Sequence, residues 1–506
     1  MLLQLLIMLE QSVIVIGGGI AGLTAGALLA HEGINVTLLE AHNQVGGCAG
    51  TFRRGPYIFD VGATQVAGFE RGGIHERIFR HLQWPLPSAD VLDPACVVHL
   101  GDGKRPIHLW HDPSKWQEER KDQFPGSELF WYLCSQLHQS NWSFACNDPI
   151  LPIQNYWDLK QFVKATRPMN VLSGFFSRSS VTDLLWLCAC NQDKRLKAFL
   201  DLQLKLYSQE LSDETAALYG ATVLQMAQAP LGLYHLHGSM QKLSDHLLAC
   251  FLRDGGNLLL GHKVVEIVKK NENSGWKLKV INKQLSLNFQ ASDLIFTLPP
   301  QSLLDLVVGL PLKYRHRLEN LSQPSGAIVF YGAIKRCHLP LNIAGHIQVM
   351  SDKQGSLFIS ISQEGDGRAP VGEATVIASA FTDVSPWMSC NEVEYRIQKK
   401  LALTNITEVL NTELNIEHEN WQHKELATPK SFAKWTGRPQ GIVGGLGQKP
   451  TIFGPFGLSS RTPMNGLWLC GDSIYPGEGT AGVSQSSVMA CKQFMSEKGL
   501  ELNLSR

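Results

Sequence analysis

The chain has 506 residues, which is enough for two or three domains. Hydrophobic residues make up 44% of it and charged residues 18%, so the chain can bury a large core. Lysine plus arginine and aspartate plus glutamate each number 45. This balance excludes the net positive charge that is typical of nucleic-acid-binding proteins, and we expect no nucleic-acid partner.

The eleven cysteines show no repeated C-x-x-C spacing, and only Cys188 and Cys190 lie close together. We therefore expect free thiols in a reducing compartment and no metal site. The opening stretch MLLQLLIML is apolar, but it lacks the basic residues of a secretion signal and is too short to span a membrane. We expect it to be a disordered start or an extension from early initiation. No run of the sequence has the length and apolarity of a transmembrane helix.

A glycine cluster lies near the start of the chain. Residues 13–16 form a short β-branched run, as in a buried parallel strand. The pattern G-x-G-x-x-G follows at once over 17–22, and apolar residues then recur at helical spacing over 23–30. A second strand over 36–39 ends at Glu40. This order of strand, glycine turn, helix, strand and acid predicts a dinucleotide-binding unit.

Each residue of this unit has a physical role. Gly17 permits the tight turn, Gly19 lets the backbone approach a pyrophosphate, and Gly22 lets the helix pack close to the strand. The carboxylate of Glu40, 18 residues after Gly22, suits ribose hydroxyls and would repel the 2′-phosphate of NADP. Gly46 and Gly47 follow soon after, where the chain must pass the cofactor again. A second glycine pair favours FAD bound in an extended form over NAD. The alternative is a glycine-rich turn that only serves packing.

The middle of the chain changes character twice. Residues 57–110 favour short strands, and residues 112–230 are mostly helical, aromatic and apolar. Within the helical part, apolar residues over 169–190 have Arg167, Arg178 and Lys194 nearby. Such a segment can lie in a membrane interface, and the alternative is an ordinary helix that lines a substrate cavity.

The second half alternates strands with two helices. A helix is expected over 238–252, followed by a strand and an antiparallel meander of three strands whose first member brings Val264 beside the adenine. Residues 311–465 favour antiparallel strands and one long helix, in which Val393, Ile397, Leu401 and Ile406 lie near one stripe.

A second glycine cluster lies near the end of the chain. A buried strand over 467–470 ends in Gly471-Asp472, and GEGTAGV leads into a helix from about residue 481. We expect Asp472 to bond hydroxyls of the ribityl chain or hydroxyls close to the phosphates. The N–H groups of the helix start stabilise negative charge at the N1/O2 edge of a reduced flavin. The residues involved are Thr480, Ala481, Gly482 and Val483.

These patterns predict an α/β fold with a Rossmann-like FAD-binding domain, made of a parallel sheet and an antiparallel meander, and a substrate domain with a mixed or antiparallel sheet and a helical insert. The expected segments are 11–110 and 236–310 for the first and second parts of the FAD-binding domain, 111–235 for the helical insert, 311–460 for the substrate domain, and 461–498 for the C-terminal part of the FAD-binding domain.

Four stretches carry a resemblance to a known family: the first cluster through AGTF, FDVGATQVAG, GSMQKLSDHLL and LWLCGDSIYPGEGTAGVSQSS. Together they resemble the carotenoid desaturase and carotenoid cis–trans isomerase family, within the phytoene-desaturase and amine-oxidase group of flavoproteins. FDVGATQVAG and GDSIYPGEGTAGVS are most similar to the C-3′,4′ carotenoid desaturase branch. The resemblance implies FAD at the positions named above. Many relatives carry Arg after the glycine pair, where this chain has Cys48, so that contact with the pyrophosphate is missing.

The resemblance implies desaturation of a carotene by hydride transfer from an allylic carbon to flavin N5, followed by proton loss from the neighbouring carbon. Glu478, His237 and His235 are the candidate proton acceptors. For the histidines the alternative is a structural role, and for Glu478 it is helix capping or a hydrogen bond to the flavin edge. We further expect quinone or O₂ as electron acceptor and peripheral attachment to the cytoplasmic side of a membrane.

Three other functions remain open. A cis–trans isomerase on the same scaffold would use reduced FAD without net oxidation. An amine oxidase would require an aromatic pair beside the flavin, for which Trp468 and Tyr475 are available, but the apolar insert disfavours it. A binding protein without flavin would keep the scaffold, but the intact glycine and acid positions disfavour it.

Overall fold

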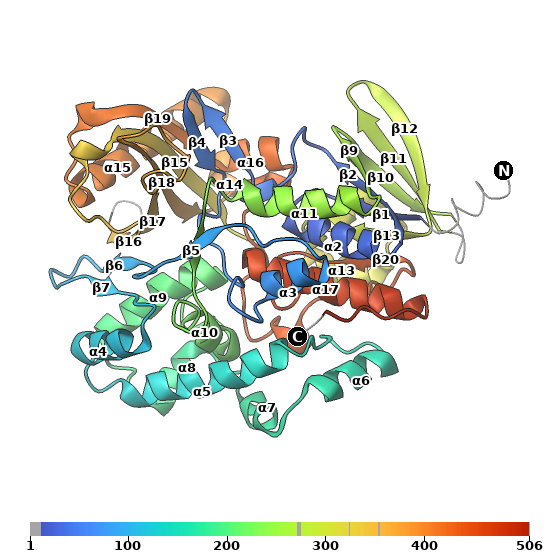
Figure 1. Cartoon of the computed structure of the whole chain (residues 1–506), viewed down its shortest axis with the longest axis horizontal. Coiled ribbons are helices and arrows are strands. Elements are labelled where there is room, and N and C mark those ends of the chain that lie inside the picture. Colours follow the sequence, from blue (N-terminus) through green and yellow to red (C-terminus); the bar gives the residue numbers. More distant parts are fainter. Residues whose placement is uncertain (1–11, 271–274, 323, 353–354, 505–506) are drawn as a thin grey trace.

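The structure, a computed structural model, describes residues 12–504 except 271–274, 323 and 353–354. The opening apolar stretch, which we expect to be a disordered start or an extension from early initiation, lies outside the described residues. Figure 1 shows three parts. A parallel sheet with its helices lies on the right, a larger sheet on the left, and a layer of helices below both.

Five parallel strands form the first sheet in the order β20-β13-β1-β2-β9. The strands are β1 (Ser12–Ile16), β2 (Asn35–Glu40), β9 (Asn257–Leu260), β13 (Asp293–Phe296) and β20 (Leu467–Leu469). Helix α2 (Ile20–His31) is buried along nearly its whole length because α11 (Gln241–Arg253) and α17 (Gly479–Glu497) both pack on it. A shorter helix, α3 (Ile74–His81), also contacts α17.

An antiparallel meander is inserted into this unit. Its members are β10 (Lys263–Lys269), β11 (Trp276–Asn282) and β12 (Leu285–Ala291), with β14 (Val307–Val308) beside β10 and helices α12 (Leu303–Leu306) and α13 (Leu312–Glu319) following. Buried and exposed residues alternate along β11, so one face of the meander packs on the core and the other meets water. The predicted meander and the α/β fold class are confirmed.

The larger sheet has seven strands in the order β19-β15-β18-β17-β16-β6-β7. They are β6 (Val97–His99), β7 (Ile107–His108), β15 (Gly326–Lys335), β16 (His346–Ser351), β17 (Gly355–Ile361), β18 (Glu373–Thr382) and β19 (Trp421–Ala427). The predicted first segment, 11–110, contains strands of both sheets. Its strands β6 and β7 extend the larger sheet, because β6 pairs in parallel with β16. The strands β6 and β7 are short, and no local sequence pattern predicts that β6 pairs with β16.

Three helices accompany the larger sheet: α14 (Ser385–Ser389), α15 (Glu392–Glu413) and α16 (Pro429–Thr436). The long helix α15 confirms the predicted helix. The predicted apolar stripe along it, however, is not buried over its whole length. Val393, Ile397 and Leu401 are exposed, and Ile406 is buried in the core. Only the C-terminal half of α15 packs on the sheet through its stripe.

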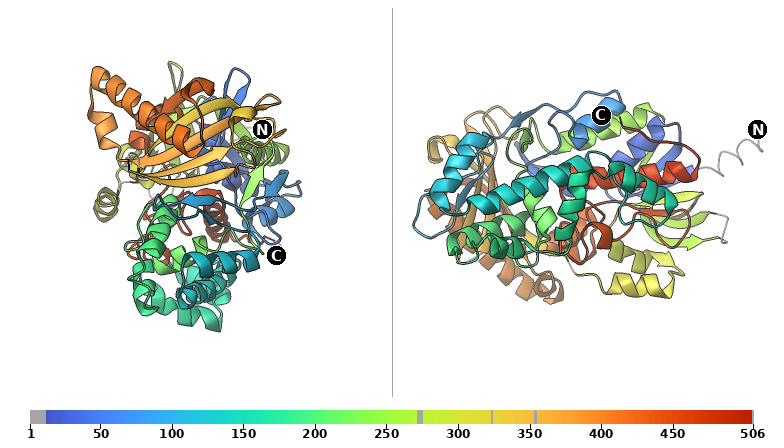
Figure 2. Two further views of the ribbon diagram at one scale, coloured as in Figure 1. Left: turned by 90° about the vertical axis from the view of Figure 1, so that its left-hand side faces the viewer. Right: turned by 90° about the horizontal axis from the view of Figure 1, so that it is seen from below.

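The helical layer runs beneath both sheets, and Figure 2 shows it from the side and from below. Its members are α4 (Pro113–Gln123), α5 (Glu128–Ala145), α6 (Tyr156–Ala165), α7 (Pro168–Ser173), α8 (Val181–Leu187), α9 (Lys194–Ser208) and α10 (Ala217–Val223). Two ribbons, β3–β4 (Thr51–Arg54, Tyr57–Asp60) and β5–β8 (Ala89–Val91, Tyr234–Leu236), connect the parts. Within the described ranges, no helix has the length and apolarity needed to cross a membrane.

Candidate active site

A cavity of about 1200 Å³ lies between the three parts of the molecule. Four residues that directly follow strands of the parallel sheet line it: Gly17 after β1, Glu40 at the end of β2, Thr297 after β13 and Asp472 beyond β20. The carboxyl ends of parallel strands are where open α/β sheets bind ligands. The cavity therefore begins at the expected edge of this sheet.

The first glycine cluster has the geometry that its spacing predicts. Gly17 has a φ of +106°, which side chains disfavour. A Cβ on Gly22 would lie 1.9 Å from the carbonyl oxygen of Gly17, so only glycine fits at this helix–strand contact. A Cβ on Gly19 would meet nothing within 4 Å, so the backbone at the start of α2 is open to the cavity. The first N–H groups of a helix lack partners within it and suit an anion.

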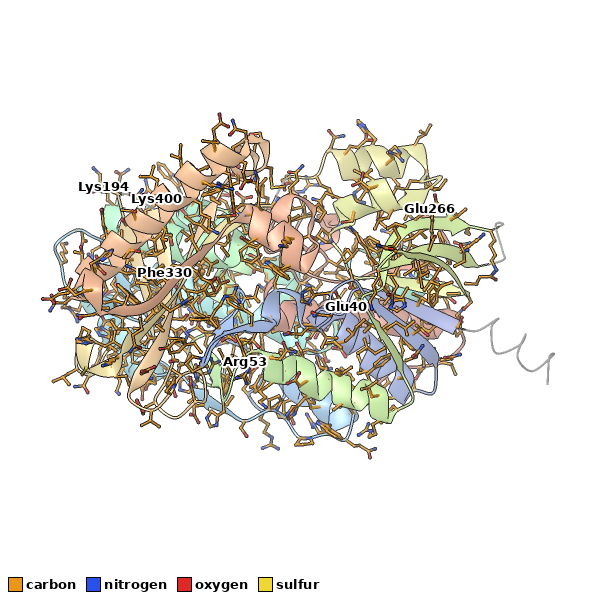
Figure 3. All side chains as sticks on the ribbon, turned by 90° about the horizontal axis from the view of Figure 1, so that it is seen from above. Glu40, Arg53, Lys194, Glu266, Phe330 and Lys400 are labelled. Atoms are coloured by element: carbon orange, nitrogen blue, oxygen red, sulfur yellow. The ribbon has the colours of Figure 1, made fainter. Side chains whose placement is uncertain are left out.

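Glu40 lies near the middle of the molecule, between the parallel sheet and the larger sheet that carries Phe330 (Figure 3). Its Oε2 accepts a hydrogen bond from the Gly18 N–H and its Oε1 one from the His42 N–H, both at 2.6 Å. Burial raises the pKa of Glu40 above its usual value, and the backbone N–H groups of His42 and Gly18 oppose this shift. The carboxylate keeps further lone pairs that can accept bonds from ribose hydroxyls.

The glycine pair brings the chain back to the same place. Gly46 has a φ of +118°, and its N–H donates to the Gly18 carbonyl at 2.8 Å. The side chain of Gln241, at the start of α11, donates to the Val45 carbonyl at 3.2 Å and supports this loop. Gly46 and Gly47 both line the cavity, beside the first cluster.

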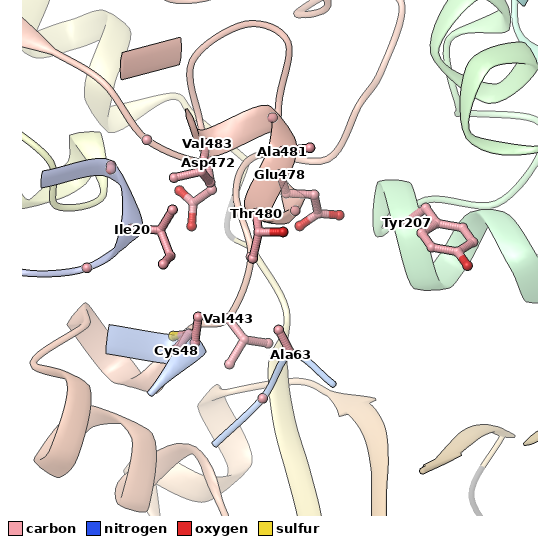
Figure 4. A pocket seen from close by; sticks show the side chains of 18 of the residues that line it. Ile20, Cys48, Ala63, Tyr207, Val443, Asp472, Glu478, Thr480, Ala481 and Val483 are labelled. Atoms are coloured by element: carbon pink, nitrogen blue, oxygen red, sulfur yellow. The ribbon is translucent and has the colours of Figure 1, made fainter. Parts of the chain in front are cut away.

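The second glycine cluster repeats the local geometry of the first. Gly477 has a φ of +122°, and a Cβ on Gly482 would lie 2.5 Å from the Gly477 carbonyl oxygen. The same spacing of five residues thus makes the same close contact at the start of α17. Thr480, Ala481, Gly482 and Val483 all line the cavity. Figure 4 shows Asp472, Glu478 and Thr480 on one wall, with Cys48 opposite.

Asp472 forms an ion pair that the sequence did not predict. Its Oδ2 lies 2.8 Å from Nη1 of Arg438, whose side chain is 14% exposed. Arg438 also donates from Nε to the Ile442 carbonyl at 2.9 Å and from Nη2 to the Gly444 carbonyl. Burial raises the pKa of the nearby Cys48 thiol, while the positive charge of Arg438 lowers it. The guanidinium and Cys48 therefore share one region of the cavity.

Glu478 is a buried carboxyl group in the cavity wall. Burial raises its pKa to about 8, although hydrogen bonds from Gln209 Nε2 at 2.8 Å and from the Gly445 N–H at 3.1 Å lower it. Both bonds go to Oε2, and Oε1 has no hydrogen-bond partner among the described residues. Glu478 precedes α17, but its side chain makes no capping bond. Glu478 therefore does not cap α17 through its side chain, and its role in proton transfer or in a hydrogen bond to the flavin edge stays a prediction.

Other predicted residues lie away from the cavity lining. His237 is half-exposed, and its Nε2 lies 2.8 Å from an Asp90 oxygen, so proton transfer to His237 in the cavity has no geometric basis. His235 is buried, and its Nε2 lies 3.0 Å from Oδ2 of Asp366 in the segment between β17 and β18, outside the lining. Val264 is a buried core residue of β10 and does not line the cavity either. Gly22 acts through packing.

The half of the cavity away from the glycine clusters is apolar. It extends between the helical layer and the larger sheet, and Tyr207 projects towards it from α9 (Figure 4). Its lining includes Leu151, Phe162, Leu206, Leu218, Val223, Met226, Leu233, Val329, Phe358, Phe381, Phe432 and Phe453. Among the aromatic candidates, Tyr475 lines the cavity, but Trp468 is buried against Phe494 of α17. These two therefore form no aromatic pair in the cavity.

Comparison with known proteins agrees with this geometry. The model of the family described as flavin-containing amine oxidoreductase matches residues 20–493. The chain belongs to that family, and its cofactor is FAD. A chloroplastic prolycopene isomerase from an Oncidium hybrid cultivar is 25% identical over 97% of this chain and 85% of its own length, and one from Daucus carota is 25% identical over 97% and 81%. An all-trans-retinol 13,14-reductase from Danio rerio is 24% identical over 56% of this chain and 46% of its own length.

Solved structures support the same fold. A putrescine oxidase variant superposes with a TM-score of 0.64 at 16% identity, over 97% of this chain and 99% of that one. An oxidoreductase from Methanosarcina mazei gives 0.61 at 17% identity, over 94% and 98%. The chain is an FAD-dependent oxidoreductase. The donor set fits the cofactor, since two helix starts, two glycine turns and the carboxylates of Glu40 and Asp472 line one cavity.

Proposed function

We propose that this flavoenzyme introduces a double bond at C-3′,4′ of a carotenoid. The observation that carries the proposal is the continuity of one cavity, with polar glycine cradles at one end and an apolar, aromatic lining at the other. A hydrocarbon chain offers few groups for hydrogen bonding, so an apolar sleeve that ends at the flavin suits it. The relatives named as prolycopene isomerases support a polyene as substrate.

Forming a double bond removes a hydride from one carbon and a proton from its neighbour. Bound FAD supplies the hydride acceptor. The apolar lining orients the chain and excludes water, and Glu478 in its ionised form accepts the proton on Oε1. The two electrons then leave to an oxidant of the quinone or O₂ class, which restores the enzyme for the next turnover.

Cis–trans isomerisation is the second candidate, because relatives matching 97% of the chain are named prolycopene isomerases. Isomerisation would use the same cavity without net removal of hydrogen. An amine oxidase activity lacks a comparable observation, since Trp468 lies outside the cavity lining.

The two candidates separate in one experiment. The FAD-loaded protein is incubated without O₂, with a quinone, and with either a poly-cis or an all-trans acyclic carotene. A product with one more conjugated double bond, formed only when the quinone is present and reduced in equal amount, supports desaturation. A changed isomer pattern with no new double bond and no quinone consumption overturns it in favour of isomerisation.

We also propose that the protein takes this substrate from a membrane to which it binds peripherally. An insert face is formed by exposed apolar residues of α6, α7 and the turn that follows: Tyr156, Leu159, Val163, Met169, Val171, Leu172 and Phe175. Exposed Lys160, Lys164, Arg167 and Arg178 flank it, which favours an anionic lipid surface. Val171 of this face and the neighbouring, exposed Gly174 also line the cavity, so the apolar sleeve reaches the surface there.

A further inference from the structure

The cavity lining contains four cationic side chains among the described residues: Arg54, Arg77, Lys399 and Arg438. Two of them form ion pairs with other residues, and a third lies apart from the glycine clusters. Arg54 pairs with Glu425 at 2.9 Å, and Arg77 pairs with Asp148 at 2.7 Å. Lys399 belongs to α15, on the larger sheet. Arg438 alone of these four pairs with a residue of the second glycine cluster, Asp472, and influences Cys48 beside the first.

The diphosphate of FAD needs a positive charge in this place. It carries about two negative charges where the first cluster and the glycine pair converge, and Asp472 adds another on the facing wall. The residue after the glycine pair is Cys48, and burial raises the pKa of its thiol, so position 48 supplies no cation. In a buried site the repulsion between a carboxylate and a diphosphate is poorly screened, so backbone N–H groups alone leave it uncompensated.

We propose that Arg438 supplies the cationic contact to the diphosphate of FAD that a residue at position 48 cannot supply. The guanidinium is held by the carbonyls of Ile442 and Gly444 and by Asp472, which fixes it in the cavity wall before the cofactor arrives. A planar guanidinium can keep Asp472 on one edge and donate a hydrogen bond to a phosphate oxygen from another. Arg438 thereby also neutralises the carboxylate that would repel the anion.

The competing interpretation is that Arg438 only holds the loop before Gly444 in shape. Its two bonds to carbonyls would then be its whole function. The two interpretations differ in one respect, because an arginine at position 48 cannot replace a clamp on the loop before Gly444, whereas it can replace a charge for the diphosphate.

The test is FAD affinity, measured by flavin fluorescence on apoprotein without substrate, for R438Q, R438K, C48R and C48R/R438Q. R54Q is the matched control, because it removes another lining arginine. R438Q should raise the Kd for FAD about 10- to 100-fold, the range expected for a lost bond to a charged group, and make that Kd less dependent on salt. R438K should bind more tightly than R438Q, and R54Q should match the wild type.

The double variant decides the matter. C48R/R438Q should recover about tenfold or more of the lost affinity, because the new guanidinium faces the same phosphates. Unchanged affinity in R438Q, or no recovery in a folded double variant, overturns the proposal. If R438Q fails to fold, C48R/R438K compared with R438K decides: tighter FAD binding in the double variant supports the proposal, and unchanged or weaker binding overturns it. Because no carotenoid is present, these results stand apart from the test of the proposed reaction.

Discussion

Gln209 Nε2 donates a hydrogen bond to Glu478 Oε2 at 2.8 Å, although 269 residues separate them in the chain. The same amide donates to the Gly445 carbonyl at 2.9 Å, and its Oε1 accepts from the Ser325 N–H at 2.9 Å. Gln209 lies directly after α9 with a φ of +62°, a conformation that most residues avoid. One side chain of the helical layer thus fixes the carboxyl group of the second glycine cluster and leaves its Oε1 without a hydrogen-bond partner among the described residues.

Replacing Glu478 by Gln should separate chemistry from cofactor binding. The amide keeps the shape of the side chain but cannot accept a proton, so turnover should fall about 10²- to 10⁴-fold while FAD remains bound. Steady-state product formation and the flavin absorbance of the purified protein measure the two effects. Full turnover in E478Q would remove Glu478 from the reaction.

The pH dependence of turnover shows whether Glu478 accepts or donates a proton. Its pKa is raised to about 8, so a proton acceptor works only in the ionised form and turnover should rise with pH up to about 8. A proton donor would give the opposite slope. The raised pKa also means that the folded state holds its proton more tightly than the unfolded state. Stability from this group is complete below about pH 4.5 and is lost as the pH rises through 8. E478Q should lack both dependences.

Gln209→Met should shift that profile. Methionine has a similar length but donates no hydrogen bond, and the bond from Gln209 lowers the pKa of Glu478. The rise of turnover should therefore move to higher pH, and the Tm should fall because several buried polar groups lose a partner. A lower Tm with an unmoved profile would reduce Gln209 to a structural residue.

Gly444→Ala tests the space around this pair. The new Cβ would lie 2.1 Å from Glu478 Oε2 and 2.2 Å from Gln209 Nε2, so both side chains must move. Gly437→Ala is the control, because Gly437 has nearly the same φ, +69° against +68°, but its Cβ would meet nothing within 4 Å. Both variants carry a backbone strain of about 1–2 kcal/mol. Only G444A should also lose turnover and shift the pH profile of turnover. If G437A has the same effects, the contact of the new Cβ with Glu478 and Gln209 is not their cause.

The sequence predicted the parts of the site that are built from local patterns. Both glycine clusters, Glu40 and Asp472 follow strands whose apolar runs and glycine turns are visible in a few residues. Gln209 and Arg438 follow helices in irregular segments, and no spacing marks them as partners of the second cluster. His237 stands close to a predicted helix start, but its partner Asp90 comes from a ribbon that the sequence does not announce. Long-range pairing of short segments is what local patterns cannot encode.

Asp472→Asn should weaken FAD binding in a different way from R438Q. The substitution removes an acceptor for ribityl hydroxyls and leaves the guanidinium of Arg438 without its carboxylate. Because the freed cation still faces the diphosphate, the loss should come with a steeper dependence of Kd on salt. Fluorescence titration at several ionic strengths measures this. A salt dependence as shallow as that of R438Q would contradict the assignment of opposite roles to the pair.

Placing charge on the insert face should detach the protein from lipid. Phe175 and Leu172 have side chains that are 80% and 67% exposed, next to Val171 at the cavity surface. The double variant F175E/L172E would have to place two carboxylates in an anionic interface. The fraction of protein that floats with anionic vesicles should therefore fall sharply, and its FAD content and Tm should stay unchanged. The matched control is L341E, since Leu341 is 95% exposed but lies in the loop between β15 and β16. If L341E lowers flotation as much as the double variant, net charge and not the insert face governs binding.

Turnover on carotene in detergent should be nearly normal in F175E/L172E and low on carotene in vesicles, because the cavity itself is untouched.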